Sequence, residues 1–563
     1  MLDSIAPLLA FTPILVVGIL LVGLRLPAAK AMPIAYLSVV LIAATLWRLD
    51  AATIAAASIN GLVVTAQLLF IIFGAILLLN TLCESGGLAV IRSGFTNVSA
   101  DRRVQVILIA WLFGSFIEGS AGFGTPAAVC VPLLVGLGFP AKSAVVSGML
   151  IQSTPVSFGA VGTPILVGVK NGLDGSQSVI DYAHRELGAG ADIWSHVLPL
   201  VGQRVALMHL IAGSLIPLMV VTVMTRFFGA KRSWLDGLRV WKFALFASLA
   251  MTIPSTIIAH TLGPEFPSLL GSLVGMILVV PVARRGWLMP DEPAWEFAEP
   301  AQWPSHWNGD VSIDLQPPRQ SLAAWKAWLP YLMIAVLLVM SRLPSLPLGD
   351  WLRSITIPSD EALTENVFGS DISIKPVAPL YLPGALFLVV CALTAVLHQM
   401  NRAAIVTATS RSLRMVASAS LALLFAVPMV QVFINSGSGA AGYESMPQVL
   451  AAGVSSLAGN AWPLMSPLVG GLGAFVAGSN TISNMMFSLF QFQVGENIGV
   501  DPIWVVALQA VGGAAGNTIC VHNVVAACAV VGLVGREGDI IRITSLVFLY
   551  YVTVAGIVGM LVT

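Results

Sequence analysis

The stretch GSFIEGSAGFGTP, residues 114–126, places one acid, Glu118, among glycines, serines, a threonine and a proline. It interrupts a long apolar run, and its glycines together with Pro126 disfavour a continuous helix. Irregular backbone inside a membrane persists only where protein buries it or where it lines a water-filled cavity. We therefore expect a re-entrant hairpin over 104–140, and a specific task for its carboxylate.

The composition around this stretch is that of a membrane protein. The 563-residue chain is 57% hydrophobic and only 10% charged, whereas soluble domains carry about 25% charged residues. Its net charge of zero argues against nucleic acid as a partner. The five cysteines show no CxxC spacing, which favours free thiols over disulfides or a metal site, and no cofactor is expected. The chain is predicted to be an all-α polytopic membrane protein.

Apolar runs of about 20 residues predict the membrane-spanning helices. We expect twelve, near 8–24, 32–47, 61–81, 143–168, 204–226, 243–261, 267–284, 326–342, 379–398, 415–434, 503–534 and 543–562. The N-terminus has no basic region or cleavage site and is expected to be retained as the first helix. Basic residues follow every odd-numbered span, which predicts cytoplasmic loops there and both termini outside. The acidic, Trp- and Pro-rich segment 286–325 is then cytoplasmic, and we interpret it as a connector rather than a folded lid.

A second glycine-rich segment, 461–497, matches the first. GSFIEGSA (114–121) aligns with GAFVAGSN (473–480), and each hairpin is followed by an interrupted helix that carries a glutamine, Gln152 or Gln509. Because the two halves have opposite predicted orientations, we expect inverted-topology repeats with two re-entrant hairpins. The predicted division is 1–226 for the first repeat, 227–325 for linker helices and loop, and 326–563 for the second repeat. Inverted repeats with paired interrupted helices are typical of transporters.

Four longer motifs carry a family resemblance. GSFIEGSAGFGTPAA, GLGFPAKSA, AGSNTISNMMF and GGAAGNTICVHNVVAACAVVGLVGREG resemble the L-lactate permease family of bacterial and archaeal proton symporters for lactate and glycolate. The resemblance covers essentially the whole chain and implies a multi-pass protein of the bacterial inner membrane.

The tetrapeptide GSNT (478–481) also resembles a signature of the wider ion-transporter superfamily, which includes divalent-anion and citrate carriers. That likeness implies a scaffold with a moving transport domain, an elevator mechanism and a homodimer. The first hairpin reads GSAG where the second reads GSNT, a departure that speaks against a first sodium site.

Two residues are candidates for proton coupling. A charge at the membrane centre costs at least about 2.5–3.5 kcal/mol, and a buried carboxyl can bind a proton near neutral pH, so Glu118 is the predicted proton carrier. The alternative is a structural acid bonded to hairpin amides. His522, in the motif GNTICVHNVV, titrates in the relevant range and could share the proton path or bind substrate. The alternative for His522 is helix packing.

The substrate carboxylate is expected to bind hairpin amides, hydroxyls and carboxamides, since neither hairpin clearly holds an Arg or Lys. The methyl group of lactate would contact Phe123 or Phe475. Taken singly, polar residues of this kind more often join helices. The candidates are Ser120, Gly122, Gly124, Thr125, Gln152, Thr163, Ser479, Asn480, Thr481, Asn484, Gln509, Asn517 and Thr518.

The sequence thus predicts proton-coupled symport of L-lactate and related small 2-hydroxy monocarboxylates, D-lactate and glycolate among them. A sodium-coupled di- or tricarboxylate carrier is the first alternative, although two carboxylates usually require more fixed positive charge. A membrane-embedded enzyme would need a histidine pair or metal cluster that seven scattered histidines do not provide. A passive channel would be recognised by flux that cannot run uphill.

Overall fold

The computed structural model describes residues 2–20, 24, 26, 28–96, 98–122, 124–188, 190, 192–309, 322–342, 346–358, 365–374, 376–533 and 535–563. Within these residues the fold is helical, and the β-structure is one isolated bridge between Ile357 and Val377. The helices are α1 (Leu2–Gly18), α2 (Ala28–Thr45), α3 (Ala51–Glu84), α4 (Gly87–Thr96), α5 (Arg102–Val106), α6 (Gly114–Ala121), α7 (Thr125–Gly136), α8 (Ala141–Leu150), α9 (Gly159–Thr163), α10 (Lys170–Leu173), α11 (Gln177–Leu187), α12 (Trp194–Ala212), α13 (Ile216–Phe228), α14 (Trp234–Leu238), α15 (Trp241–Thr261), α16 (Pro267–Arg284), α17 (Ala324–Arg342), α18 (Pro347–Arg353), α19 (Pro383–Leu397), α20 (Arg402–Ile434), α21 (Met446–Ala458), α22 (Trp462–Ala477), α23 (Asn480–Ile498), α24 (Pro502–Gly516), α25 (Val521–Val530) and α26 (Glu537–Val562).

Seven described helical segments are long and apolar enough to cross a membrane, and two bent pairs raise that number to nine. The seven are Ala51–Glu84, Arg102–Ala121, Trp194–Phe228, Trp241–Thr261, Pro267–Arg284, Ala324–Ser341 and Glu537–Val562. The bent pairs are Ala141–Ser153 with Pro155–Leu173, at 61°, and Arg402–Ala417 with Ser420–Ile434, at 42°. This is a multi-pass helical membrane protein.

Most of the predicted spans coincide with these segments. The predicted spans 8–24, 32–47, 379–398 and 503–534 instead hold shorter apolar helices. The predicted span 503–534 is interrupted, as expected for the helix that carries Gln509: α24 ends at Gly516 and α25 begins at Val521. The first arm of the hairpin predicted over 104–140 is one long helical segment. Arg102–Ala121 has 20 residues, a helical length of about 30 Å, which is enough for a full crossing.

Both predicted hairpins are helical hairpins. In the first, the chain turns at Gly122 and Gly124, whose φ angles of 62° and 76° suit glycine and end the helix. The return helix α7 brings Leu137 back to the start of the hairpin, where its carbonyl accepts a hydrogen bond from Arg102. In the second hairpin, α22 and α23 pack side by side, and the indole of Trp462 donates to Gln491 Oε1 at 2.7 Å.

The helix that follows the first hairpin is interrupted, as predicted. Two short 3-10 turns, Ile151–Ser153 and Pro155–Phe158, replace the regular ladder of backbone hydrogen bonds. Ala160 and Val161 then adopt left-handed angles with φ of 41° and 57°. Such angles are rare for residues with a side chain, above all for a β-branched one. They persist only where the surrounding structure enforces them, often at functional sites.

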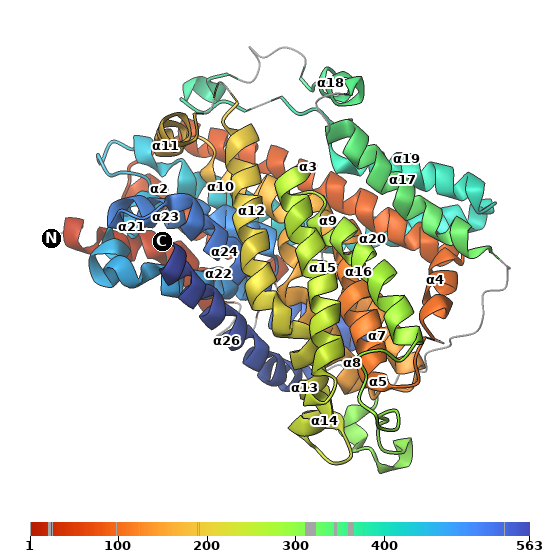
Figure 1. Cartoon of the computed structure of the whole chain (residues 1–563). Coiled ribbons are helices and arrows are strands. Elements are labelled where there is room, and N and C mark those ends of the chain that lie inside the picture. Colours follow the sequence, from red (N-terminus) through yellow and green to blue (C-terminus); the bar gives the residue numbers. More distant parts are fainter. Residues whose placement is uncertain are drawn as a thin grey trace.

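The helices α12, α15 and α16 run side by side across one face of the molecule, coloured yellow to green in Figure 1. The helix α16 also packs against α6 of the first hairpin. In the same view α11 and α18 lie at one end of the molecule, while α14 and the segment after α16 lie at the other. The predicted linker helices therefore form part of the wall around the first hairpin.

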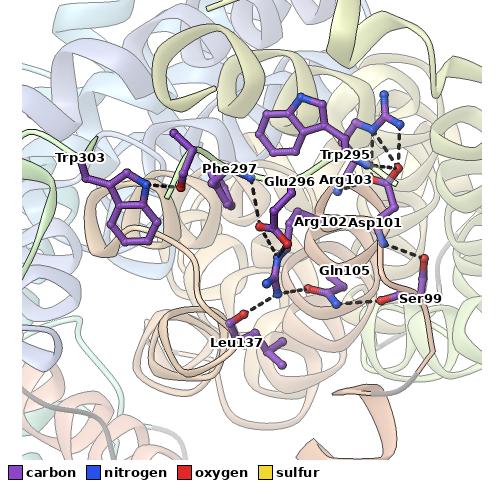
Figure 2. A network of polar contacts seen from close by, with 11 residues as sticks. Ser99, Asp101, Arg102, Arg103, Gln105, Leu137, Trp295, Glu296, Phe297 and Trp303 are labelled. Atoms are coloured by element: carbon purple, nitrogen blue, oxygen red, sulfur yellow. Dashed lines mark hydrogen bonds and ion pairs between the residues drawn. The ribbon is translucent and has the colours of Figure 1, made fainter. Parts of the chain in front are cut away.

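The segment 287–309, which we call the strap, covers the base of the first hairpin (Figure 2). The amide of Arg102 donates to the Trp295 carbonyl at 3.1 Å, and the Arg102 side chain bonds Glu296 at 2.8 Å. Phe297 is buried and packs edge-on against Phe139 with ring centroids 5.1 Å apart. The prediction of a plain connector over 286–325 is therefore wrong for this part, because apolar burial and backbone hydrogen bonds fix the strap in place.

Candidate functional site

Glu118 lies on α6, one turn before the hairpin tip. Its side chain is 2% exposed, and its Oε2 atom has no hydrogen-bond partner among the described residues. The amide of Gly122 donates to the main-chain oxygen of Glu118, not to its carboxyl group. Gly159 faces the carboxyl so closely that a Cβ there would lie 2.5 Å from Oε1. This environment disfavours the alternative of a structural acid that is bonded to hairpin amides.

The polar residues of the first tip are engaged within the hairpin. The hydroxyl of Ser120 donates to the Ile117 carbonyl at 3.0 Å, and that of Thr125 donates to Gly122 at 2.7 Å. Both hydroxyls have thereby used their proton and can offer a ligand only an acceptor oxygen. A Cβ on Gly122 would collide with Ala160, which shows how closely this tip approaches the interrupted helix.

At the second tip, Gly478 ends α22 with φ of 77°, and the extended residue Ser479 precedes α23. Asn480 and Asn484, on α23, have buried polar atoms without a hydrogen-bond partner among the described residues. Asn480 is 1% exposed, and neither its Nδ2 nor its Oδ1 has a partner among the described residues. Asn484 donates to the Pro164 carbonyl at 3.0 Å, while its Oδ1 is unpartnered.

The two asparagines converge on Gly513 of α24. A Cβ on Gly513 would lie 2.0 Å from Asn480 Oδ1 and 3.6 Å from Asn484 Oδ1. Thr481 approaches the first interrupted helix, where its carbonyl would lie 2.7 Å from a Cβ on Gly168. The second tip therefore touches both interrupted helices.

Two further predicted residues, both threonines, donate to neighbouring carbonyls. Thr163 donates to Ala160 at 2.6 Å, and Thr518 donates to Ala515 at 2.8 Å. Asn517 keeps an unpartnered Oδ1 atom.

The glutamines join helices. Gln509 donates to Ser483 Oγ at 3.0 Å and accepts from Gln491 at 3.0 Å, within the second hairpin and its neighbour α24. Gln152 accepts a hydrogen bond from Asn523 at 3.3 Å.

The two tips come together at the break in the first interrupted helix. Gly122 lies against Ala160, and Asn484 bonds the carbonyl of Pro164, so residues 160–164 lie between the tips. Sequence reasoning missed Asn523, whose Oδ1 would lie 3.1 Å from a Cβ on Gly124. Its only signal was its place one residue after His522, in the helix that follows the second break.

Several predictions remain open. Phe123 and the side chain of His522 lie outside the described residues. In the described part of the chain no group of three or more His, Cys, Asp or Glu side chains could hold a metal ion. Because Glu118, Asn480 and Asn484 are all buried, the candidate site is closed to bulk water in this conformation.

Paired helical hairpins, whose glycine-rich tips meet interrupted helices inside a multi-pass helical protein, define a membrane transporter. The whole-chain comparison agrees: the L-lactate permease family model matches residues 6–563, and the chain belongs to that family. The L-lactate permease of Salmonella typhimurium is 26% identical over 506 residues, covering 87% of this chain and 83% of its own length. Glycolate permease GlcA of Escherichia coli K12 is 27% identical over 597 aligned positions, covering 99% and 96%. Among solved structures, the YdaH transporter of Alcanivorax borkumensis covers 87% of this chain and 84% of its own, with a TM-score of 0.40 and 15% identity.

Proposed function

We propose that this transporter is a proton-coupled symporter of L-lactate and related small 2-hydroxy monocarboxylates, D-lactate and glycolate among them. The family relationship supports the substrate class, since relatives are named L-lactate permease and glycolate permease. The observation that carries the coupling proposal is the buried carboxyl of Glu118, whose Oε2 lacks a partner beside the interrupted helix. An unpaired charge at this depth is costly, so the group crosses the membrane as the neutral acid and exchanges its proton when the site opens.

In the proposed substrate site, Asn480 donates its amide N–H to the substrate carboxylate. Its Nδ2 is a buried nitrogen donor without a partner among the described residues. Backbone N–H groups at the starts of α7 and α23 add positive partial charge near the same place. Exchanging the positions of the Asn480 oxygen and nitrogen would not alter this assignment, because neither atom has a hydrogen-bond partner among the described residues.

We assign the 2-hydroxyl group of the substrate to Asn484 Oδ1, which has no partner among the described residues. The Nδ2 atom of the same side chain donates to the Pro164 carbonyl, which fixes its orientation. A hydroxy acid supplies the proton that this acceptor lacks, whereas a simple carboxylic acid would leave the acceptor buried and unpaired. A substrate with a single negative charge also suits a site built from amides. A second carboxylate would require a further charged partner.

The remaining proposals concern the architecture. We propose twelve spans and two re-entrant hairpins in inverted repeats, 1–226 and 326–563, that are joined by 227–325. Both termini would lie outside the bacterial inner membrane, and transport would follow an elevator mechanism in a homodimer. The contact of both tips with one interrupted helix supports a shared central site.

The coupling proposal is tested with Glu118→Gln in proteoliposomes. The amide keeps the size of the side chain but cannot carry a proton, so we expect lactate exchange at equal concentrations to continue while proton-driven accumulation stops. Gly159→Ala, which pushes a methyl group against the carboxyl, should reduce the same accumulation. Full accumulation by Glu118→Gln would refute the assigned role.

The alternative of a sodium-coupled carrier is separated in the same vesicles. Uptake of L-lactate in sodium-free buffer supports proton coupling, whereas uptake that appears only after sodium is added supports the alternative. Flux that never exceeds equilibrium under either gradient would indicate a passive channel.

A further inference from the structure

A buried histidine outside the proposed site belongs to a hydrogen-bond chain. His209, on α12, is 3% exposed and lies edge-on to Phe158. Its Nδ1 atom is 2.5 Å from the hydroxyl of Tyr551, and its Nε2 atom is 2.8 Å from the hydroxyl of Ser157. Tyr551 in turn contacts the Thr154 hydroxyl at 3.2 Å.

The partners fix the direction of this chain. Ser157 donates its proton to the Ala510 carbonyl at 3.3 Å, so it accepts from His209 Nε2. His209 Nδ1 then accepts from Tyr551, and the tyrosine oxygen accepts from Thr154. The imidazole is neutral in this arrangement. This series of hydrogen bonds ends at the Ala510 carbonyl, which has no proton to pass on, so it does not conduct protons. We call the series from Thr154 through Tyr551 and His209 to Ser157 the tether.

The tether holds the interrupted helix on both sides of Pro155. Thr154 is tied to Tyr551 of α26, and Ser157 is tied to His209 of α12. Between them, the carbonyl of Pro155 accepts a hydrogen bond from Ser268 of α16 at 2.8 Å. These hydrogen bonds lie where the two 3-10 turns lack the regular backbone hydrogen bonds of an α-helix. The residue that follows the second turn, Gly159, faces Glu118.

Residues 154–158 are buried, and a small cavity borders part of this segment. The cavity lies on the side of α12, α15 and α16, and is lined by Thr154, Phe158, Ala206, His209, Met251, Thr252, Ser255 and Ser268. Residues beside an empty space have fewer atoms to hold them in place. When the tether is cut, the segment can therefore shift slightly toward this cavity.

We infer that His209 is a positioning residue for transport, which acts with Tyr551 to hold residues 154–158 so that Gly159 stays against the Glu118 carboxyl. This inference rests on the proposed role of Glu118. It predicts that a cut tether impairs the proton-driven step more than substrate binding or exchange.

Neighbouring tyrosines provide the matched test. Tyr551→Phe removes the hydroxyl that joins His209 to Thr154. Tyr550→Phe removes a hydroxyl on the same helix whose hydrogen bond, at 3.0 Å, goes to the Ala212 carbonyl of α12 and not to the interrupted helix. Both variants are reconstituted at equal amounts, and their thermal unfolding in detergent is recorded as a check on folding.

For Tyr551→Phe we expect proton-driven L-lactate uptake to fall about tenfold in maximal rate, with unchanged KM in lactate exchange. Tyr550→Phe should match the unsubstituted protein. Replacement of His209 by Leu should reproduce the loss. His209→Gln, which keeps a donor and an acceptor, should restore part of the rate.

Equal proton-driven rates for Tyr551→Phe and Tyr550→Phe would overturn the inference. The Glu118→Gln variant, measured beside them, keeps the two claims apart. If it still accumulates lactate, the role of Glu118 is wrong, while the tyrosine comparison still decides whether the tether positions the interrupted helix for transport.

Discussion

Gly513 is the residue at which the proposed binding site can be probed with the smallest change. Alanine is a better helix former than glycine by about 1 kcal/mol, so Gly513→Ala should not weaken α24 as a helix. Its methyl group would nevertheless meet Asn480 Oδ1 at 2.0 Å and displace that side chain. We expect KM for L-lactate uptake to rise about tenfold or more, since small displacements of binding groups have large effects.

Gly538 provides the control for that substitution. It lies in the first turn of α26, and a Cβ there would meet nothing within 4 Å. Gly538→Ala should leave uptake kinetics unchanged. Unchanged kinetics in Gly513→Ala as well would remove Asn480 from the binding site.

Asp501 and Arg204 form a second residue-scale test, which concerns stability. Burial by itself raises the pKa of Asp501, but the hydrogen bond and charge of Arg204 and the hydrogen bond from Tyr182 outweigh it and hold this pKa below its ordinary value. The guanidinium of Arg204 also stacks over Trp504. Arg204 is therefore held in place by both Asp501 and Trp504.

Asp501→Asn keeps the oxygen that caps α24 at Ile503 but removes the charge. Because the ion pair between Asp501 and Arg204 is partly exposed, this substitution should lower the free energy of unfolding by about 1 kcal/mol. The folded pKa lies below that of the unfolded chain, so the stabilisation is present above about pH 4 and disappears as pH falls through the folded pKa. Thermal unfolding should show a lower Tm for the variant at pH 7 and no difference in strong acid. A constant difference across this range would contradict the ion-pair account.

At the residue scale, the sequence sufficed to predict a buried acid beside a hairpin tip, because Glu118 is a lone acid among glycines in an apolar run. The sequence did not suffice to predict which polar residues bond one another across the molecule. Asn523 bonds Gln152 across 371 positions, and Tyr551 bonds His209 across 342. Neither pair leaves a local pattern, since each residue alone resembles an ordinary polar residue that joins helices.

At the scale of elements, the strap provides a clear contrast between packing and surface charge. Phe297 is buried between the strap and the base of the first hairpin, and its replacement by Ala should cost about 3 kcal/mol. Glu296 is about half exposed in its ion pair with Arg102, so Glu296→Gln should cost less than about 1 kcal/mol. Thermal unfolding in detergent measures both. Equal, small effects would show that the strap is only loosely docked.

The hairpins could be predicted because glycine and proline mark the breaks directly. Gly122, Gly124 and Gly478 all have the positive φ angles that the turns require. The first arm is one long helical segment because its apolar residues 107–113 continue the helix from Arg102 up to the tip. The docking of the strap could not be predicted, since its aromatic residues follow neither a helical nor a strand period.

At the scale of the whole molecule, each predicted repeat supplies one hairpin and one interrupted helix, and the structure brings these four parts into contact. The buried polar atoms without a partner among the described residues include atoms of Glu118, Asn480, Asn484 and Asn517, which come from both halves of the chain. A site that both halves share can be opened to either side by moving one set of elements against another. The proposed symport depends on this shared site.

The most direct test is uptake of labelled L-lactate into proteoliposomes with an imposed inward proton gradient in sodium-free buffer. We predict accumulation above the external concentration, its collapse when an uncoupler is added, and no accumulation by Glu118→Gln. Accumulation that requires sodium, or that Glu118→Gln retains in full, would contradict proton coupling through this carboxyl.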